Sequence, residues 1–274
     1  MNIRFLLPLL LLSGCNALKF NLPESQPANP IRVMTYNIHA GKDAQQVDNL
    51  ARVAAVIDSA DADIVLLQEV DRRTQRSGGV DHFAELERLT GMHGIFGKSL
   101  DYQGGQYGIA VLSRWPVDSV AAVPLKVEPP QERSGGSYES RIALHVMVRT
   151  EHGDINVVNT HLDPAAAGTF RKQELIDIFS HMRQRIGADT PIVFGGDLNA
   201  RPATDDIQAV GFALTDAFAS CGSGTGETFP AHAPDRRIDY LFLRHARCST
   251  ARVVNTRASD HRPMLAIIHL TGGA

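Results

Sequence analysis

The sequence has few cysteines and lacks the short motifs of several large enzyme classes. Only three of its 274 residues are cysteine, and none stands with histidines at the spacing of a zinc site. The chain contains neither the Gly-x-Ser-x-Gly turn of serine hydrolases nor the Gly-x-x-x-x-Gly-Lys-Ser/Thr loop that binds nucleotide phosphates. These absences exclude thiolate zinc sites, nucleophile-elbow hydrolysis and P-loop chemistry.

Excess positive charge is also absent. The formal net charge is −3 and the isoelectric point is about 6.4, whereas a domain that holds nucleic acid through a general positive field usually exceeds about 9. A local groove of arginines stays open as an alternative. With 43% apolar and 21% charged residues, the composition is that of a globular protein with one large or two small domains.

No apolar run reaches the roughly 20 residues that a membrane-spanning helix needs. Phe5 to Leu12 is apolar but short, and Leu12-Ser13-Gly14-Cys15 follows at once. This segment resembles the lipobox of bacterial lipoproteins, which implies a signal peptide over residues 1–15 and a lipid on Cys15. An ordinary secretory signal or a buried hydrophobic stretch is the alternative.

The lipobox sets expectations for the rest of the chain. Residues 16–30 contain three prolines among polar residues, so we expect a flexible linker followed by one folded domain over 31–274. We expect an exported protein anchored in the bacterial cell envelope, at the outer membrane in a Gram-negative organism. In that oxidising compartment Cys221 and Cys248 either form a disulfide or remain two separate buried thiols.

Short apolar runs alternate with helix-like stretches from Ile31 onward. Helical periodicity predicts helices over 47–59, 80–89 and 169–186. About ten strands with few helices indicate a mixed α/β or α+β domain of two or more layers. The runs that predict strands are 31–38, 64–68, 108–112, 117–125, 142–148, 155–160, 192–194, 238–243, 251–254 and 264–270.

Polar residues stand at the ends of several predicted strands, where a sheet brings side chains to a common rim. Asn37 and Glu69 close buried runs, Tyr107 precedes one, and His161 ends another. The phenol of Tyr107 could reach a substrate oxygen. His161 could donate a hydrogen bond to a phosphoryl oxygen or a proton to a leaving group. Taken singly, each residue also fits a turn, cap or packing role.

The strongest local signal is Gly195-Gly196-Asp197-Leu198-Asn199 after a buried strand. Two glycines let the backbone approach a ligand closely, and Asp197 and Asn199 point the same way in an extended turn, where they could hold a water or a metal. A plain turn is the alternative.

Two acidic residues near the C-terminus could prepare a histidine for catalysis. Asp239 opens an apolar strand, and Asp260-His261 precedes another. A buried aspartate beside a histidine orients the imidazole and raises its pKa. The sequence does not decide whether Asp239 or Asp260 does this for His261. A site built from Glu, Asp, Asn and His favours a hard cation with oxygen ligands, hence Mg²⁺ or Mn²⁺.

Together and in this order, these residues resemble the endonuclease/exonuclease/phosphatase superfamily over residues 31–270. The resemblance implies a four-layer α/β/β/α sandwich, in which two mixed sheets are flanked by helices and the site lies at one rim. It also implies hydrolysis by in-line attack of water on phosphorus.

The resemblance further implies a role for each residue. Asp197 and Asn199 would orient the water and steady the phosphate, and His261, oriented by Asp239, would act as base or phosphate-binding imidazole. The implied metal ligands are Glu69, Asn37 and Asp260. The implied catalytic residues are His161, Asp197, Asn199, Asp239, His261 and Tyr107, with His161 as a second phosphate-site histidine and Tyr107 as a hydrogen-bond donor to phosphate.

Two positions depart from the family pattern. Residue 39 is His where some members carry an acid, which weakens a two-metal site. Residue 109 is Ile where many members carry Asn, which could alter contacts beside Tyr107.

The resulting hypothesis is an exported, monomeric, Mg²⁺- or Mn²⁺-dependent phosphodiesterase. Its partners would be a phosphoester substrate, either a lipid head group or nucleic acid, and the membrane that holds its anchor. The anchor favours lipid, because an acidic protein gains little from the field of a polyanion. A tethered nuclease and a phosphomonoesterase are alternatives. A non-catalytic envelope-binding lipoprotein is the alternative of another class, and the retained site residues argue against it.

Overall fold

The computed structural model describes residues 30–126, 139–166 and 168–271. The predicted signal peptide, Cys15 and nearly all of the predicted linker lie outside these ranges, so their assignment stays a prediction. Within the described ranges, no helix is long and apolar enough to cross a membrane.

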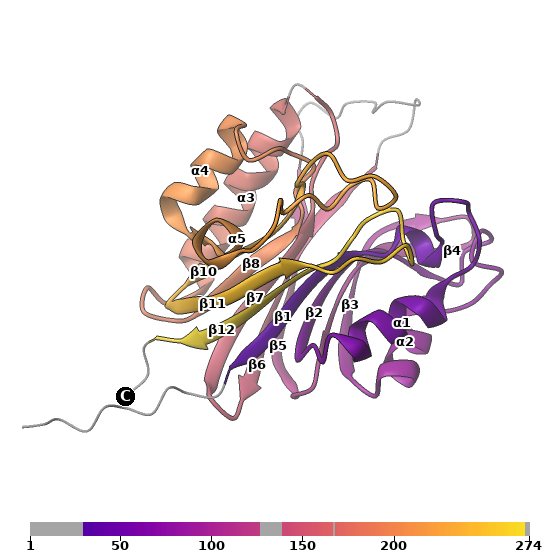
Figure 1. The fold of residues 1–274 in the computed structure, drawn as a ribbon, viewed down its shortest axis with the longest axis horizontal. Helices are drawn as coiled ribbons and strands as arrows, with labels where there is room; N and C mark the ends of the chain where they lie inside the picture. Colours follow the sequence, from indigo (N-terminus) through magenta and orange to yellow (C-terminus); the bar gives the residue numbers. More distant parts are fainter. Residues whose placement is uncertain (1–29, 127–138, 167, 272–274) are drawn as a thin grey trace, which may run out of the picture.

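Two six-stranded sheets pack face to face, and helices cover their outer faces (Figure 1). The first sheet has the strand order β11-β12-β1-β2-β4-β3. Its strands are β1 (Ile31–Asn37), β2 (Ile64–Arg72), β3 (His93–Tyr102), β4 (Gly105–Ser113), β11 (Ala246–Val253) and β12 (Met264–Leu270). The second sheet has the order β5-β6-β7-β8-β10-β9. Its strands are β5 (Val117–Leu125), β6 (Arg141–Thr150), β7 (Gly153–His161), β8 (Ile192–Asp197), β9 (Thr215–Asp216) and β10 (Asp239–Arg244).

The helices divide between the two outer faces. Helices α1 (Leu50–Ser59) and α2 (His82–Thr90) pack on the first sheet, and α3 (Thr169–Arg185) and α4 (Asp205–Ala213) pack on the second. A short 3₁₀ turn, η1 (His39–Gly41), follows β1, and α5 (Ala217–Cys221) lies against β10 and β11.

Three apolar cores separate these layers. One fills the space between the sheets, one lies under α1 and α2, and one lies under α3 and α4. Strand β1 serves two of them: Ile31 and Val33 face the other sheet, whereas Met34 and Tyr36 face the helices. Its continuous apolar run therefore reflects burial on both faces. The predicted four-layer α/β/β/α sandwich is confirmed.

Strand direction gathers the polar strand ends at one edge. Strands β1 and β2 are parallel, and so are β7 and β8. Their carboxyl ends therefore meet at the same rim, where β10 begins at Asp239, opposite Asp197 of β8. Ile31 at the start of β1 pairs with Ile268 near the end of β12. The two ends of the described chain thus lie at the edge opposite that rim.

Cys221 and Cys248 form a disulfide, with their Cα atoms 5.9 Å apart. The bond joins α5 to β11 of the first sheet, and α5 follows β9 of the second sheet directly. The sequence left open a disulfide or two separate buried thiols, and the structure shows the disulfide.

Some elements differ from the sequence prediction. Strand β3 was not predicted, because it lies at a sheet edge with mostly half-exposed residues and shows no clear alternation. Helices α4 and α5 and the two-residue strand β9 were also missed. Helix α1 begins at Leu50 rather than residue 47, because Lys42 and Asp48 pair in an extended bridge just before it and Val47 is exposed.

Candidate active site

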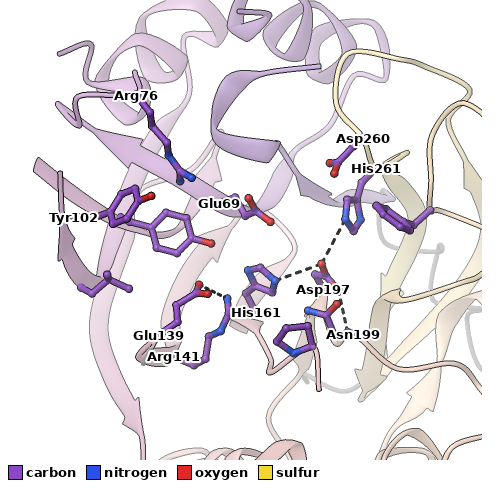
Figure 2. A pocket seen from close by; sticks show the side chains of 14 residues that line it. Glu69, Arg76, Tyr102, Glu139, Arg141, His161, Asp197, Asn199, Asp260 and His261 are labelled. Atoms are coloured by element: carbon purple, nitrogen blue, oxygen red, sulfur yellow. Dashed lines mark hydrogen bonds and ion pairs between the residues drawn. The ribbon is translucent and has the colours of Figure 1, made fainter. Parts of the chain in front are cut away.

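A cavity of about 490 Å³ opens at the rim where the polar strand ends meet (Figure 2). Seven of the predicted site residues line it: Glu69, Tyr107, His161, Asp197, Asn199, Asp260 and His261. Asn37 and Asp239 are buried and each contacts a lining residue. The fold thus brings all nine predicted residues together.

Asp197, which ends β8, lies at the centre of the cluster and is almost fully buried. Its Oδ2 accepts a hydrogen bond from Asn37 Nδ2 at 3.0 Å. The same oxygen lies 3.5 Å from His161 Nε2 and 3.6 Å from His261 Nε2. Its Oδ1 accepts from the backbone N–H of Asn199 at 2.9 Å, which closes the turn after the strand.

The pKa of Asp197 is raised to about 7. Burial is the largest cause, because it penalises the charged carboxylate, and the negative charge of Asp239 adds to it. The charge of His261 and the hydrogen bond from Asn37 oppose the rise. A carboxylate with this pKa can accept a proton near neutral pH.

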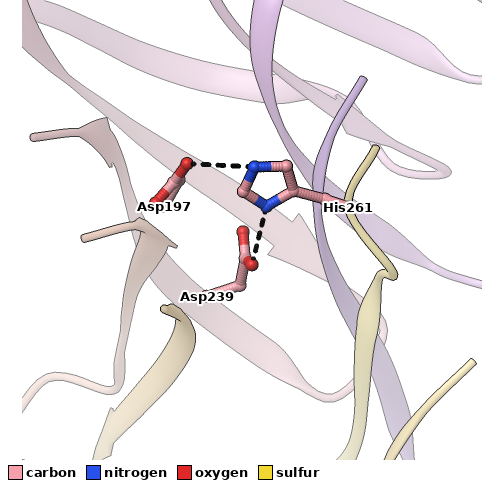
Figure 3. Close-up of side chains that lie close together, drawn as sticks. All are labelled: Asp197, Asp239 and His261. Atoms are coloured by element: carbon pink, nitrogen blue, oxygen red, sulfur yellow. Dashed lines mark hydrogen bonds and ion pairs between the residues drawn. The ribbon is translucent and has the colours of Figure 1, made fainter. Parts of the chain in front are cut away.

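His261 and Asp239 form a buried pair, shown in Figure 3, in which His261 Nδ1 lies 2.9 Å from Asp239 Oδ2. Burial alone would lower the pKa of His261, but the charges of Asp239 and Asp197 and the hydrogen bond to Asp239 outweigh it and raise the pKa to about 10. His261 is therefore an imidazolium at neutral pH. The geometry makes Asp239, rather than Asp260, the residue that orients it.

The backbone has a positive φ at two cavity residues, and at Glu69 this conformation is strained. Glu69 has φ of +58° and stands at a bulge in β2, and Asn199 has φ of +49°. Left-handed backbone is uncommon outside glycine and asparagine. At the bulge, this conformation turns a carboxylate out of an otherwise buried strand.

The glycines before Asp197 act differently from the sequence expectation. A Cβ on Gly196 would lie 1.9 Å from the carbonyl oxygen of Thr160, and one on Gly195 would lie 2.3 Å from that of Tyr240. The close approach is therefore to the neighbouring strands β7 and β10, rather than to a ligand.

Glu69 and Asp260 are the two carboxylates that the sequence predicted as metal ligands. Both line the cavity, and neither has a lysine or arginine ion-pair partner within the part of the chain that the structure describes. Carboxylate oxygens suit Mg²⁺ or Mn²⁺. Asn37 donates to both Glu69 Oε1 and Asp197 Oδ2, and its own oxygen accepts from the His39 N–H. Its predicted role as a ligand stays a prediction.

Asp197, Asp239 and His261 also have potential ligand atoms within 4.8 Å of one another. In this structure the trio is also a hydrogen-bonded array, because His261 Nδ1 faces Asp239 Oδ2 and His261 Nε2 faces Asp197 Oδ2. The predicted metal ligands Glu69 and Asp260 stay a prediction.

Tyr107 of β4 and His161 of β7 line the cavity from the two different sheets. Tyr107 is 8% exposed, and burial and the charge of Glu69 raise its pKa well above the ordinary value, so the phenol keeps its proton. Both side chains can donate hydrogen bonds to a bound anion.

Sequence reasoning missed seven further cavity residues, of which four are polar: Arg76, Tyr102, Glu139 and Arg141. Arg76 and Glu139 lie in loops, where no apolar pattern marks them. Arg141 stood just before a predicted strand, and that position was the only signal available.

The two departures from the family pattern have different surroundings. His39 Nδ1 lies 3.8 Å from Asp260 Oδ1, so the unusual histidine borders the proposed cation site. Ile109 is 2% exposed and belongs to the core between the sheets. Its side chain therefore does not reach the cavity.

Comparisons with known proteins agree with this geometry. The chain is 25% identical to protein YbhP of Escherichia coli K12 over 262 residues, covering 91% of this chain and all of YbhP. The endonuclease/exonuclease/phosphatase protein of Beutenbergia cavernae superposes with a TM-score of 0.70 at 25% identity, covering 89% of this chain and 72% of that one. A mannosyl-6-phosphatase of Bacteroides thetaiotaomicron superposes with a TM-score of 0.71 at 16% identity, covering 87% and 99%.

The family model matches residues 34–261, from β1 to the histidine of the buried pair. The chain belongs to the Endonuclease/Exonuclease/phosphatase family, whose members hydrolyse phosphoester bonds.

Proposed function

We propose that this protein is a metal-dependent phosphoester hydrolase, and that its reaction is phosphodiester cleavage by an activated water. The observation that carries the proposal is the position of Asp197: a buried carboxylate with a pKa near 7 lies between two histidines at the base of the cavity. Such a group is suited to remove a proton from water at neutral pH.

Each site residue has a role in the proposed in-line displacement at phosphorus. Asp197 and Asn199 orient the water, and Asp197 takes its proton as the oxygen bonds to phosphorus. The bond from phosphorus to the alcohol oxygen breaks, and that oxygen takes up a proton. The charged His261 and the N–H and O–H groups of His161 and Tyr107 stabilise the negative charge on the phosphoryl oxygens.

A divalent cation held by Glu69 and Asp260 would neutralise phosphoryl charge as a Lewis acid. The donor set contains only oxygen ligands, with His39 at its border, which supports Mg²⁺ and leaves Mn²⁺ as the second choice.

The test is hydrolysis of bis(4-nitrophenyl) phosphate by the purified protein with and without Mg²⁺ or Mn²⁺. We expect activity that EDTA abolishes and that Asp197→Ala and His261→Ala reduce by at least a thousandfold, while far-UV circular dichroism stays native. Undiminished turnover in both folded variants contradicts the site assignment. Folded wild-type protein that cleaves no phosphoester with either metal supports the non-catalytic alternative.

Export and lipid anchoring at Cys15 are part of the proposal. The Cys221–Cys248 disulfide supports an oxidising compartment, since such bonds are rare in the cytosol of mesophiles. Mass spectrometry of protein from a membrane fraction checks the anchor: we expect a mature chain that starts at a lipid-modified Cys15, and an unmodified Met1 contradicts it.

A further inference from the structure

The side of the cavity away from Asp197 is a wall of two arginines, two tyrosines and a glutamate. It consists of Arg76, Tyr102, Tyr107, Glu139 and Arg141, and we call it the arginine–tyrosine wall (Figure 2). The proposed mechanism uses only Tyr107 from it. If the proposed function holds and phosphorus binds beside Asp197, this wall faces the rest of the substrate.

Arg76 is already neutralised by a carboxylate. Its Nε and Nη2 donate to the two oxygens of Asp71 at 2.7 and 2.9 Å, and Asp71 is fully buried. The guanidinium lies over the rings of Tyr102 and Tyr107, with its Cζ 4.9 and 5.3 Å from their centroids. This network holds the arginine in place at the cavity.

Arg141 is also paired, but incompletely. Its Nη1 lies 2.9 Å from Glu139 Oε1, and its side chain is 5% exposed. Its Nε is buried and has no hydrogen-bond partner among the described residues. A buried donor without a partner is unfavourable, and this one belongs to a side chain that lines the cavity. Glu139, one-third exposed, presents a carboxylate beside it.

The wall therefore offers donors and acceptors side by side, with little net charge. Hydroxyl groups both donate and accept, so they match such a surface. A second phosphate only accepts, and the carboxylate of Glu139 would repel it.

Size and shape point the same way. A cavity of about 490 Å³ is in the range of small-molecule sites. A nucleic-acid strand is held by a groove of cations that are free to pair with phosphates, whereas both arginines here have carboxylate partners. Tyr102 is 36% exposed and offers an apolar ring surface for the C–H face of a small ring.

We propose that the arginine–tyrosine wall binds the alcohol part of the substrate, and that this alcohol is a small polyhydroxylated group, a sugar or a polyol. Glu139 and Tyr102 are then residues that determine specificity.

The test compares kcat/KM of the purified full-length protein, with Mg²⁺, across defined phosphoesters. The panel holds a hexose 6-phosphate, its methyl diester, glycerophosphoglycerol, a single-stranded oligonucleotide, sphingomyelin vesicles and bis(4-nitrophenyl) phosphate. We expect at least one hexose or glycerol ester to exceed the oligonucleotide and the vesicles by tenfold or more. A preference for the hexose esters indicates a sugar, and a preference for glycerophosphoglycerol indicates a polyol.

Variants test the wall itself. Glu139→Gln and Tyr102→Leu should each lower the ratio of kcat/KM for the preferred ester over the aryl ester about tenfold, mainly by raising KM for the preferred ester. The matched controls are Glu151→Gln, beyond the far end of β6, and Phe212→Leu, an exposed aromatic on α4. Both controls should keep the wild-type ratio.

The outcomes separate this inference from the proposed function. Preference for the oligonucleotide or the vesicles, or an unchanged ratio in both wall variants, overturns the inference while cleavage of the aryl ester still supports a phosphoesterase. Failure to cleave any ester, the aryl ester included, overturns both.

Discussion

Individual side chains at this site depend on one another for their charge. His261 is held as an imidazolium by Asp239, and Asp197 is held partly protonated by burial and by the same Asp239. One aspartate that does not line the cavity therefore sets the protonation of two residues that do.

We predict that kcat/KM rises with pH through about 7, as Asp197 loses its proton, and falls near pH 10, as His261 loses its own. A bound divalent cation would move the acid limb to lower pH, because positive charge favours the carboxylate. A profile measured from pH 5 to 10.5 with the aryl diester checks both limbs. An alkaline limb at or below pH 7 contradicts the assignment of His261.

Asp239→Asn should move the whole profile to lower pH. Loss of the Asp239 charge lowers the pKa of His261, which burial then depresses further, and it also removes one cause of the raised pKa of Asp197. We expect the alkaline limb to fall by more than one pH unit. Asp235→Asn, on an exposed loop aspartate, is the control and should leave both limbs in place. If Asp239→Asn also leaves both limbs at their wild-type pH, Asp239 does not set the pKa values of His261 and Asp197.

The sequence predicted nine residues for the site, because each stands at or near the end of a strand that the apolar pattern reveals. It left the choice between Asp239 and Asp260 open, since that choice depends on an imidazole orientation that only the fold determines. Arg76 and Glu139 escaped because tertiary packing, rather than local pattern, brings their loops to the cavity.

Strand β8 tolerates little change at its glycines. It lies between β7 and β10 and carries Asp197 at its end. The sequence predicted the strand and its two glycines, but their purpose became clear only from the neighbouring strands, whose carbonyls leave no space for a Cβ.

Gly196→Ala should therefore destabilise the fold strongly. The new Cβ would meet Thr160 O at 1.9 Å, and φ of +132° is unfavourable for any L side chain. Overpacking and backbone strain together suggest a loss of roughly 4 kcal/mol. Gly211→Ala is the matched control: it lies in α4 with no atom within 4 Å of a Cβ, so we expect a gain of about 0.5 to 1 kcal/mol. Urea unfolding measures the free energy of unfolding of both variants. Equal changes in the two would contradict this account of β8.

For the molecule as a whole, the disulfide is the one covalent link between distant parts of the described chain. It spans 27 residues. A loop of this length is expected to contribute about 3 to 4 kcal/mol by restricting the unfolded chain. The alternation of strands and helices in the sequence predicted the overall architecture. It did not predict the disulfide, because sequence alone gives no distance between two cysteines.

The variant Cys221→Ser/Cys248→Ser should melt about 10 °C below the wild type. Differential scanning calorimetry in oxidising buffer measures this shift, and the wild type in dithiothreitol should resemble the variant. Because the disulfide lies away from the cavity residues, kcat/KM at 25 °C should stay unchanged. Equal melting temperatures with and without reductant would show that the link does not contribute to stability.

The position of Ile31 at the edge opposite the cavity bears on how an attached protein would work. A resin or fusion partner joined directly at residue 30 would lie at the edge where β1 begins, so the cavity mouth would be directed away from it. Dissolved esters then reach Asp197 without obstruction by the supporting surface. Protein immobilised through its N-terminal end should keep its turnover of soluble substrates, whereas attachment through a cysteine introduced at the exposed cavity residue Tyr102 would block their entry.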